Sequence, residues 1–111
     1  MLFLIFFFVV IALAGAVLAR YELGGREIPL PVGLLHGLAA LAAIALLVVH
    51  DMHAPNNLLV NSATAVFVLA ATGGLLLFLF RVQRQPVAGF VVTLHAGFAL
   101  TAIVMLAIGY L

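Results

Sequence analysis

The chain has 111 residues, of which 68% are hydrophobic and 6% are charged, and its mean hydropathy is +1.47. A soluble domain carries about 25% charged residues, and so short a chain cannot bury this much apolar surface in a core of its own. The bilayer must therefore be its solvent. The net charge of +1 excludes a nucleic acid as partner, and the lack of cysteine excludes disulfides, iron–sulfur clusters and thiolate zinc sites.

Four runs without a formal charge follow one another, at residues 2–19, 30–49, 58–80 and 87–111. Each is close to the roughly 20 residues that a helix needs to cross a hydrocarbon core about 30 Å thick. The four arginines and the three acidic residues all fall between the runs. The sequence therefore predicts an all-α membrane protein, with one domain of four transmembrane helices in an up-down bundle over residues 1–111.

The boundaries of these helices carry recognisable signals. Pro29, Pro31 and Pro86 lie near the predicted starts of the second and fourth helices, where proline is tolerated. Asn56 or Asn57 can cap the third helix. The first run could instead be a cleaved signal peptide, but it has no basic segment before it and is longer than the usual apolar region of such peptides. We therefore expect it to remain as a span.

The arginines predict the orientation of the chain. Arg20 and Arg26 lie in the first loop, and Arg81 and Arg84 lie in the third, which is on the same side of the membrane. Cytoplasmic loops carry an excess of basic residues. We expect an integral membrane protein, of a bacterial inner membrane, with these two loops in the cytoplasm and with both termini and residues 50–57 outside.

An internal repeat relates the two halves of the chain. The segments LHGLAALAAIALL and LHAGFALTAIVML, which begin at Leu35 and Leu94, are identical at seven of thirteen positions, and they align His36 with His95, 59 positions later. One explanation is chance similarity between apolar helices. The other is a duplicated two-helix hairpin, which would relate the second and fourth helices by a pseudo-two-fold axis along the membrane normal and place both histidines at one depth.

His36 and His95 are the main candidate ligands. Haem iron takes one nitrogen ligand on each side of the porphyrin, and four-helix bundles build such sites from inward-facing side chains of different helices. An ionisable residue inside a span is costly and points to function, although a histidine there can also serve as a structural hydrogen-bonding group. We expect one haem b per chain, with its iron bound by these two residues.

Glycines accompany the two histidines. Gly37 follows His36, Gly97 lies near His95, and Gly15 and Gly74 lie in the first and third helices. A flat macrocycle between helices needs positions without side chains, so these four glycines are candidate cofactor-binding positions. The alternative is that they only allow close helix packing, as small residues commonly do in membranes.

His36 and His50 are fourteen positions apart, close to four helical turns, so they share one face about 21 Å apart. Together with the glycines and His95, this pattern resembles the membrane b-type cytochromes, in which histidines so spaced on one helix bind two stacked haems. The resemblance implies a four-helix bundle with histidine haem ligands. The chain departs from that pattern because Gly109 stands fourteen positions after His95, so a second haem lacks a ligand on the fourth helix.

The segment HDMH, residues 50–53, carries four potential metal ligands. Imidazole and thioether groups together suit copper, and His50 and His53 are neighbours if the helix continues through them. We consider three alternatives for this segment: a copper site, part of a second haem site, and an interfacial turn that is simply solvated.

No carboxylate lies inside the four runs, no nucleophile–base pair is present, and no segment of these residues is long enough to form a soluble nucleotide-binding domain. Electrons would therefore pass to a quinone or to a redox partner subunit. We expect a membrane electron-transfer protein or the anchor of a redox complex, at most an electron-transfer component of an oxidoreductase. The alternatives are a cofactor-free accessory subunit of a larger membrane complex and a chlorophyll-binding subunit, in a hetero-complex or a homo-oligomer.

The depth of the two histidines predicts a role for arginine. His36 and His95 lie nearer to the arginine-containing loops than to the opposite end of their helices. Haem carries two propionates, and arginine binds carboxylates strongly. We expect Arg81 or Arg84, which share the shorter of the two loops, to hold a propionate. The alternative is that the arginines serve membrane topology alone.

Overall fold

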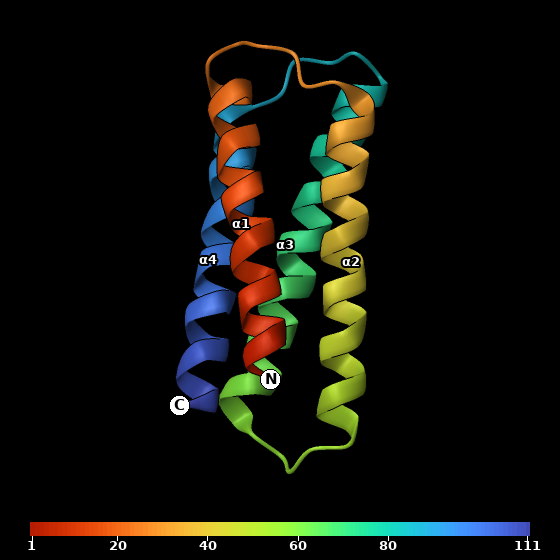
Figure 1. Cartoon of the computed structure of the whole chain (residues 1–111). Coiled ribbons are helices and arrows are strands. Elements are labelled where there is room, and N and C mark those ends of the chain that lie inside the picture. Colours follow the sequence, from red (N-terminus) through yellow and green to blue (C-terminus); the bar gives the residue numbers. More distant parts are fainter.

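The computed structural model describes all 111 residues as four antiparallel helices without any strand (Figure 1). The helices are α1 (Leu2–Leu23), α2 (Leu30–Met52), α3 (Leu58–Val82) and α4 (Gly89–Tyr110). Each is long and apolar enough to cross a membrane. The predicted fold class, a four-helix transmembrane bundle, is confirmed.

The helices do not end where the charge-free runs end. α1 continues past residue 19 to Leu23, α2 past 49 to Met52 and α3 past 80 to Val82, whereas α4 begins at Gly89 rather than at residue 87. The length of a charge-free run reflects the thickness of the hydrocarbon core. The helix itself can extend beyond that core and ends where its last carbonyl groups are capped. Charged side chains can occupy the last turn because they reach the polar interface from there.

α1 and α3 stop in the same way. Gly25 and Arg84, 59 positions apart, both adopt left-handed backbone conformations, with φ of 73° and 53°. In both places the N–H of the next residue donates to the carbonyl five residues before it, at 2.9 Å. This is the hydrogen bond of a Schellman cap, which glycine fits best. Arg84 is the only residue other than glycine with a positive φ.

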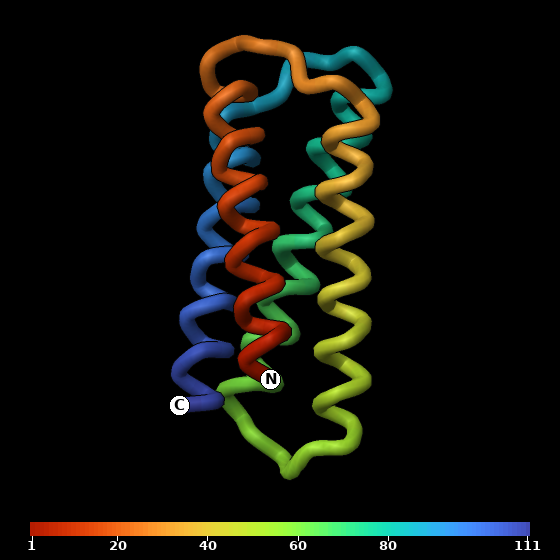
Figure 2. Tube along the Cα trace, in the orientation of Figure 1, coloured from red at the N-terminus to blue at the C-terminus, as the bar shows by residue number.

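The four helices form a closed ring of neighbours (Figure 2). α1 packs against α2 and α4, and α3 packs against α2 and α4, so α1 lies diagonally across from α3 and α2 across from α4. The two loops that contain the arginines lie at one end of the bundle, and both termini and the α2–α3 loop lie at the other. The repeat therefore relates helices that face each other across the bundle axis.

The core agrees with this internal symmetry, because eight of its eleven buried residues occur in pairs 59 positions apart, the exceptions being Val60, Ala70 and Val92. These pairs are Leu4 with Ala63, Phe8 with Phe67, Ala43 with Ala102, and Leu47 with Leu106. Positions related by the repeat thus face the same axis from opposite helices. This agreement in burial extends over all four helices and is the one that a duplicated hairpin would produce.

The two hairpins are not packed equally. α3 and α4 approach each other most closely, and α1 and α2 contact each other least. Near the end with the termini, Asn57 caps α3 by accepting hydrogen bonds from the N–H groups of Leu59 and Val60, and its amide donates to the carbonyl of Gly109 at 2.9 Å. A Cβ atom on Gly109 would lie 2.8 Å from a methyl group of Val60. This tight contact has no counterpart in the first hairpin.

Candidate functional site

His36 of α2 and His95 of α4 meet near the bundle axis. Their ring centres are 6.4 Å apart, and the ring planes are inclined at 83°. The sequence predicted the two histidines at one depth, and the structure brings their rings together edge to face from diagonally opposed helices. They are the two ionisable side chains that meet in the interior of the bundle.

The backbone holds one ring nitrogen of His95. Its Nδ1 lies 2.7 Å from the carbonyl oxygen of Ala70 in α3. A carbonyl only accepts hydrogen bonds, so Nδ1 carries a proton and donates it. In the neutral imidazole, Nε2 is then the nitrogen with the free lone pair. Nε2 makes no hydrogen bond of its own. This is the arrangement in which a histidine ligand is usually held, with one nitrogen anchored to a carbonyl and the other free for a metal.

His36 is left without any polar partner. Its Nδ1 is buried and makes no hydrogen bond. Ile11 is the repeat counterpart of Ala70, but its carbonyl accepts no hydrogen bond from Nδ1 of His36. A buried polar atom without a partner costs about 1–3 kcal/mol, and such atoms in a folded protein commonly mark a functional site. We infer that the position of His36 is retained for something other than the stability of the bundle.

Two glycines make room for the two imidazoles. A Cβ atom on Gly15 would lie 2.9 Å from Cε1 of His36, and a Cβ atom on Gly74 would lie 2.9 Å from Cε1 of His95. These contacts are related by the repeat, and no side chain fits at either position unless the ring moves. The glycines thus set the rotation of the histidine side chains, a more specific role than the general space for a macrocycle that the sequence suggested.

The separation of the rings matches a shared metal ion. With metal–nitrogen bonds of about 2.0–2.1 Å and a ring nitrogen about 1.1 Å from its ring centre, two imidazoles on opposite sides of one metal have ring centres about 6.2–6.4 Å apart. The observed separation is 6.4 Å. The two planes are also free to be perpendicular, since each imidazole rotates about its own metal–nitrogen bond.

A cavity of about 510 Å³ adjoins the two rings, between α1, α2 and α3. Along α2 it runs from Leu30 to Ile44, so His36 borders it near its middle. Its walls are aliphatic and glycine-rich, and its one lining hydroxyl, on Thr72, donates to the carbonyl of Val68 at 2.9 Å. Sites for small molecules and cofactors have this size and this mainly apolar lining. The cavity arises because α1 and α2 pack less closely than α3 and α4 do.

An ion pair closes the cavity at the end near the arginine loops. Arg81 of α3 donates a hydrogen bond to the carboxylate of Glu22 in α1, and both side chains border the cavity. Their side chains are 22% and 19% exposed. Of the two arginines predicted to hold a propionate, only Arg81 borders the cavity. Arg84 is exposed in the loop beyond it.

The other two predicted glycines lie in different surroundings. Gly37 borders the cavity, and a Cβ atom there would meet nothing within 4 Å. Gly97 is exposed on the outer face of α4, away from the cavity, and a Cβ atom there would also meet nothing. Gly97 therefore has no contact with the site, and the prediction that it makes room for a cofactor gains no support, because its distance from His95 along the sequence does not show which face of α4 it occupies.

A second polar group lies at the opposite end of the bundle. The hydroxyl of Tyr110 in α4 is 3.0 Å from Nδ1 of His50, and it donates to Asp51 at 3.5 Å. Asp51 also accepts a hydrogen bond from Thr64 of α3, at 3.0 Å. The group links the last turns of α2 and α4 to α3. His50 thus has protein partners at the position where the sequence suggested a metal.

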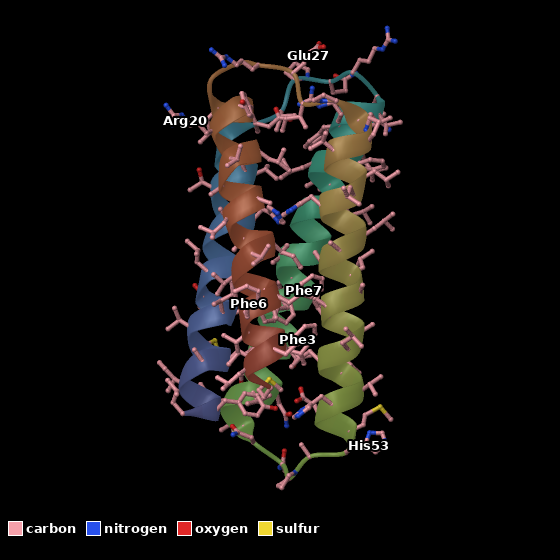
Figure 3. All side chains as sticks on the ribbon, viewed as in Figure 1. Phe3, Phe6, Phe7, Arg20, Glu27 and His53 are labelled. Atoms are coloured by element: carbon pink, nitrogen blue, oxygen red, sulfur yellow. The ribbon has the colours of Figure 1, made fainter.

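His53 does not join this group. It is exposed, and its Nδ1 donates to the carbonyl of Val49 at 2.8 Å. No three histidine, aspartate or glutamate side chains come together in the chain in a way that could hold a metal ion. Figure 3 shows His53 at the end of the bundle opposite Arg20 and Glu27. The copper site suggested by HDMH therefore gains no support from the arrangement of its residues.

Two members of these polar groups have no signal of their own in the sequence. Glu22 is expected in a loop and Tyr110 at the end of an apolar run, yet each lies 59 positions from the residue that it contacts, Arg81 and Asp51 respectively. The repeat was recognised through identical residues. Near the symmetry axis, however, positions related by the repeat contact each other. Two identical charges would repel each other there, so charged residues at such positions must be complementary instead of identical.

Comparison of the chain with protein-family models, with curated protein sequences and with solved structures finds no match.

Proposed function

We propose that this chain is a membrane electron-transfer protein that holds one haem b between His36 and His95. The observation that carries the proposal is the geometry of this pair: two imidazoles 6.4 Å apart on the bundle axis, beside an apolar cavity of about 510 Å³. Haem supplies one-electron exchange at its iron, at a potential that the ligands and the surrounding polarity set.

The symmetry of the bundle supports identical ligands. Where the two repeats meet on the axis at their ends, they differ: Glu22 faces Arg81, and Asp51 faces Tyr110. At the centre they keep the same residue, His36 and His95. A metal bound from two sides can take the same ligand from each repeat. Two imidazoles could also form a hydrogen bond with each other, since each can donate and accept, but no hydrogen bond joins these two rings. The pair therefore does not act as a hydrogen-bonded link between α2 and α4, which favours ligation.

The chain's own residues would position the group. The carbonyl of Ala70 holds His95 with Nε2 unprotonated, and Gly15 and Gly74 set the rotation of the two rings. The aliphatic walls of the cavity would exclude water, and Arg81 is the cation that could face a propionate. Apolar surroundings favour the reduced state of a haem, because that state carries less charge. Nearby charges change this preference, so Arg81 and Glu22 would adjust the reduction potential of the haem.

The electron donor or acceptor would reach the protein from within or beside the membrane. The four helices expose large apolar side chains along their outer faces, which fits contact with lipid. We propose a quinone or a redox partner subunit in this role. We also propose that the chain lies in a bacterial inner membrane with the arginine loops in the cytoplasm.

Absorption spectroscopy tests the proposal. Protein produced with an adequate haem supply should show a sharp Soret band, and after reduction with dithionite the sharp α and β bands of low-spin, bis-imidazole iron. His36→Ala and His95→Ala should each abolish the low-spin spectrum. His50→Ala and His53→Ala are matched controls, since both remove a histidine from α2 or its end, and they should leave the spectrum unchanged.

The same spectra decide between the alternatives. A colourless preparation would contradict the haem and would favour a cofactor-free accessory subunit. A strong band in the far red would indicate chlorophyll, for which one axial ligand per pigment is enough. Loss of the low-spin spectrum in the His50 or His53 variant, with no change in the His36 and His95 variants, would place the ligands at the other end of the bundle.

A further inference from the structure

The cavity ends at an ion pair that already occupies the arginine nearest to it. We propose that Glu22 is a resident counter-ion that Arg81 exchanges for a carboxylate of the bound group. This inference rests on the proposed function, because it takes haem, with its two propionates, as that group. In this proposal Glu22 and Arg81 recognise a carboxylate of the bound group, in addition to linking α1 and α3 as an ion pair.

The hydrogen bonding of Arg81 leaves room for a second carboxylate. A guanidinium has five N–H donors in a planar fork, and Arg81 uses a single nitrogen, Nη2, to donate to one oxygen of Glu22. This is the single hydrogen bond that the Arg81 side chain makes to the protein. Arginine binds carboxylates most strongly through two parallel hydrogen bonds. The contact with Glu22 is thus a partial one, which another carboxylate can replace or extend.

No other arginine is placed for this role. Arg20 and Arg84 are exposed and do not border the cavity, and Figure 3 shows Arg20 projecting outward from the end of the bundle. Arg26 lies over the ring of Tyr21, 5.7 Å from its centre. Arg81 is therefore the only arginine with access to the cavity, and Glu22 is the only carboxylate there.

Charge explains why the arginine is paired before the group arrives. A charge left unpaired in a partly desolvated site is strongly destabilising. Glu22 lies opposite Arg81 at the equivalent position of the other repeat, so the pair leaves this end of the cavity neutral while the chain folds. A carboxylate of the bound group can then take over Arg81, while Glu22, in the last turn of α1, turns toward solvent.

Two forms of the ligand separate charge recognition from the rest of binding. The full chain is prepared without haem in detergent and titrated with haem and with haem dimethyl ester, which lacks both carboxylates. The low-spin Soret band measures the Kd. The wild type should bind haem more tightly than the ester. Arg81→Gln should weaken haem binding about tenfold or more, as expected for loss of a hydrogen bond between charged groups, and should leave ester binding unchanged.

Glu22→Gln gives the opposite result if Glu22 is a competitor. It should tighten haem binding several-fold and should not tighten ester binding. Arg84→Gln is the matched control, because it removes an arginine at the same end of the bundle that has no access to the cavity, and it should change neither Kd. Circular dichroism and gel filtration check that each variant is folded. If Arg81→Gln does not fold, Glu22→Gln and the two ligands on the wild type still test the proposal.

The outcomes distinguish this inference from the proposed function. If haem binds with a low-spin spectrum but the ester binds equally well and Glu22→Gln changes nothing, the exchange is wrong while the haem site stands. If Glu22→Gln weakens haem binding, Glu22 supports the group instead of competing with it, and the inference is also wrong. If the wild type gives no low-spin spectrum with either ligand, the proposed function fails and this inference fails with it.

Discussion

Phe8 of α1 and Phe67 of α3 stack face to face across the bundle axis, with ring centres 4.0 Å apart and planes inclined by only 16°. Both are buried, and the fully buried Leu47 and Leu106 belong to the same cluster. Because Phe67 lies seven residues from Gly74, about two helical turns away, the stack fills the bundle on the side of the histidines away from the arginine loops. That is where a second, stacked cofactor would have to lie.

This packing predicts one haem per chain. The position that would supply the missing ligand is Gly109, where even a Cβ atom would meet Val60 at 2.8 Å, so an imidazole cannot be placed there without separating α3 from α4. A pyridine haemochrome assay, set against protein concentration from amino-acid analysis, should give a ratio near one. A ratio near two would contradict the prediction and would make His50 and His53 the next ligands to test.

The glycines beside the histidines predict a change in ligation without a change in fold. In Gly15→Ala or Gly74→Ala the new methyl group meets the far end of a histidine side chain at 2.9 Å, so the ring can turn away while the helices stay in place. The helix itself gains up to about 1 kcal/mol from the better propensity of alanine. We therefore expect lower haem content or a partly high-spin spectrum, with thermal unfolding of the haem-free chain changed little.

Gly97→Ala is the matched control for these variants. It makes the same change in a membrane helix, but on the outer face of α4, where a Cβ atom meets nothing within 4 Å. Its haem content and spectrum should equal those of the wild type. If all three variants keep the wild-type spectrum, then Gly15 and Gly74 do not set the rotation of the rings. Equal loss of haem in all three would indicate a general effect on the helices.

The two related helix caps predict opposite effects on stability. Arg84 holds a positive φ of 53°, which is costly for a residue with a Cβ, whereas its counterpart Gly25 holds φ at 73° without that cost. Arg84→Gly should raise the free energy of unfolding by about 1 kcal/mol, and Gly25→Ala should lower it by a similar amount. Arg84→Gln removes the charge but keeps the strain, so it separates the two effects. Reversible unfolding in mixed micelles with denaturing detergent measures the free energy of unfolding of each variant. If Arg84→Gln were also stabilising, the cause would be the charge and not the backbone strain.

Much of the fold could be predicted because its signals are local. Run length and the position of charges specify four spans, and Asn57 was one of the two residues predicted to cap the third. The depth of His36 and His95 followed from their shared place in the repeat. The ends of the helices could not be found in this way, because α1 and α3 stop at left-handed caps beyond the charge-free runs, at Gly25 and Arg84.

The surroundings of the histidines depend on packing between helices, which no local pattern contains. The sequence could not indicate that α1 and α2 separate enough to leave a cavity, nor that Gly97 faces outward while Gly74 faces His95. Tyr110 and Glu22 contact residues 59 positions away in the other repeat. Such contacts become visible only when the helices related by the repeat are known to face each other across one axis.

The orientation of the bundle can be measured directly because the chain contains no cysteine. The loop of residues 83–88 shares its end of the bundle with Arg20, and the loop of residues 53–57 lies at the other end, beside both termini. Four arginines in the first and third loops, with none in the second, predict that the arginine end faces the cytoplasm. A single cysteine in each of two loops therefore reports the side on which each end lies.

Gln85→Cys and Asn56→Cys place one exposed thiol in each of these loops without changing any charge. With a membrane-impermeant maleimide, the Asn56 variant should be labelled in intact cells, and the Gln85 variant should be labelled only after the membrane is permeabilised. Gln83→Cys, in the same loop as Gln85, should repeat the second result. Labelling of the two loops in the opposite sense would place Glu22 and Arg81 at the outer surface, and a quinone or subunit that approaches that end of the cavity would then do so from outside the cell.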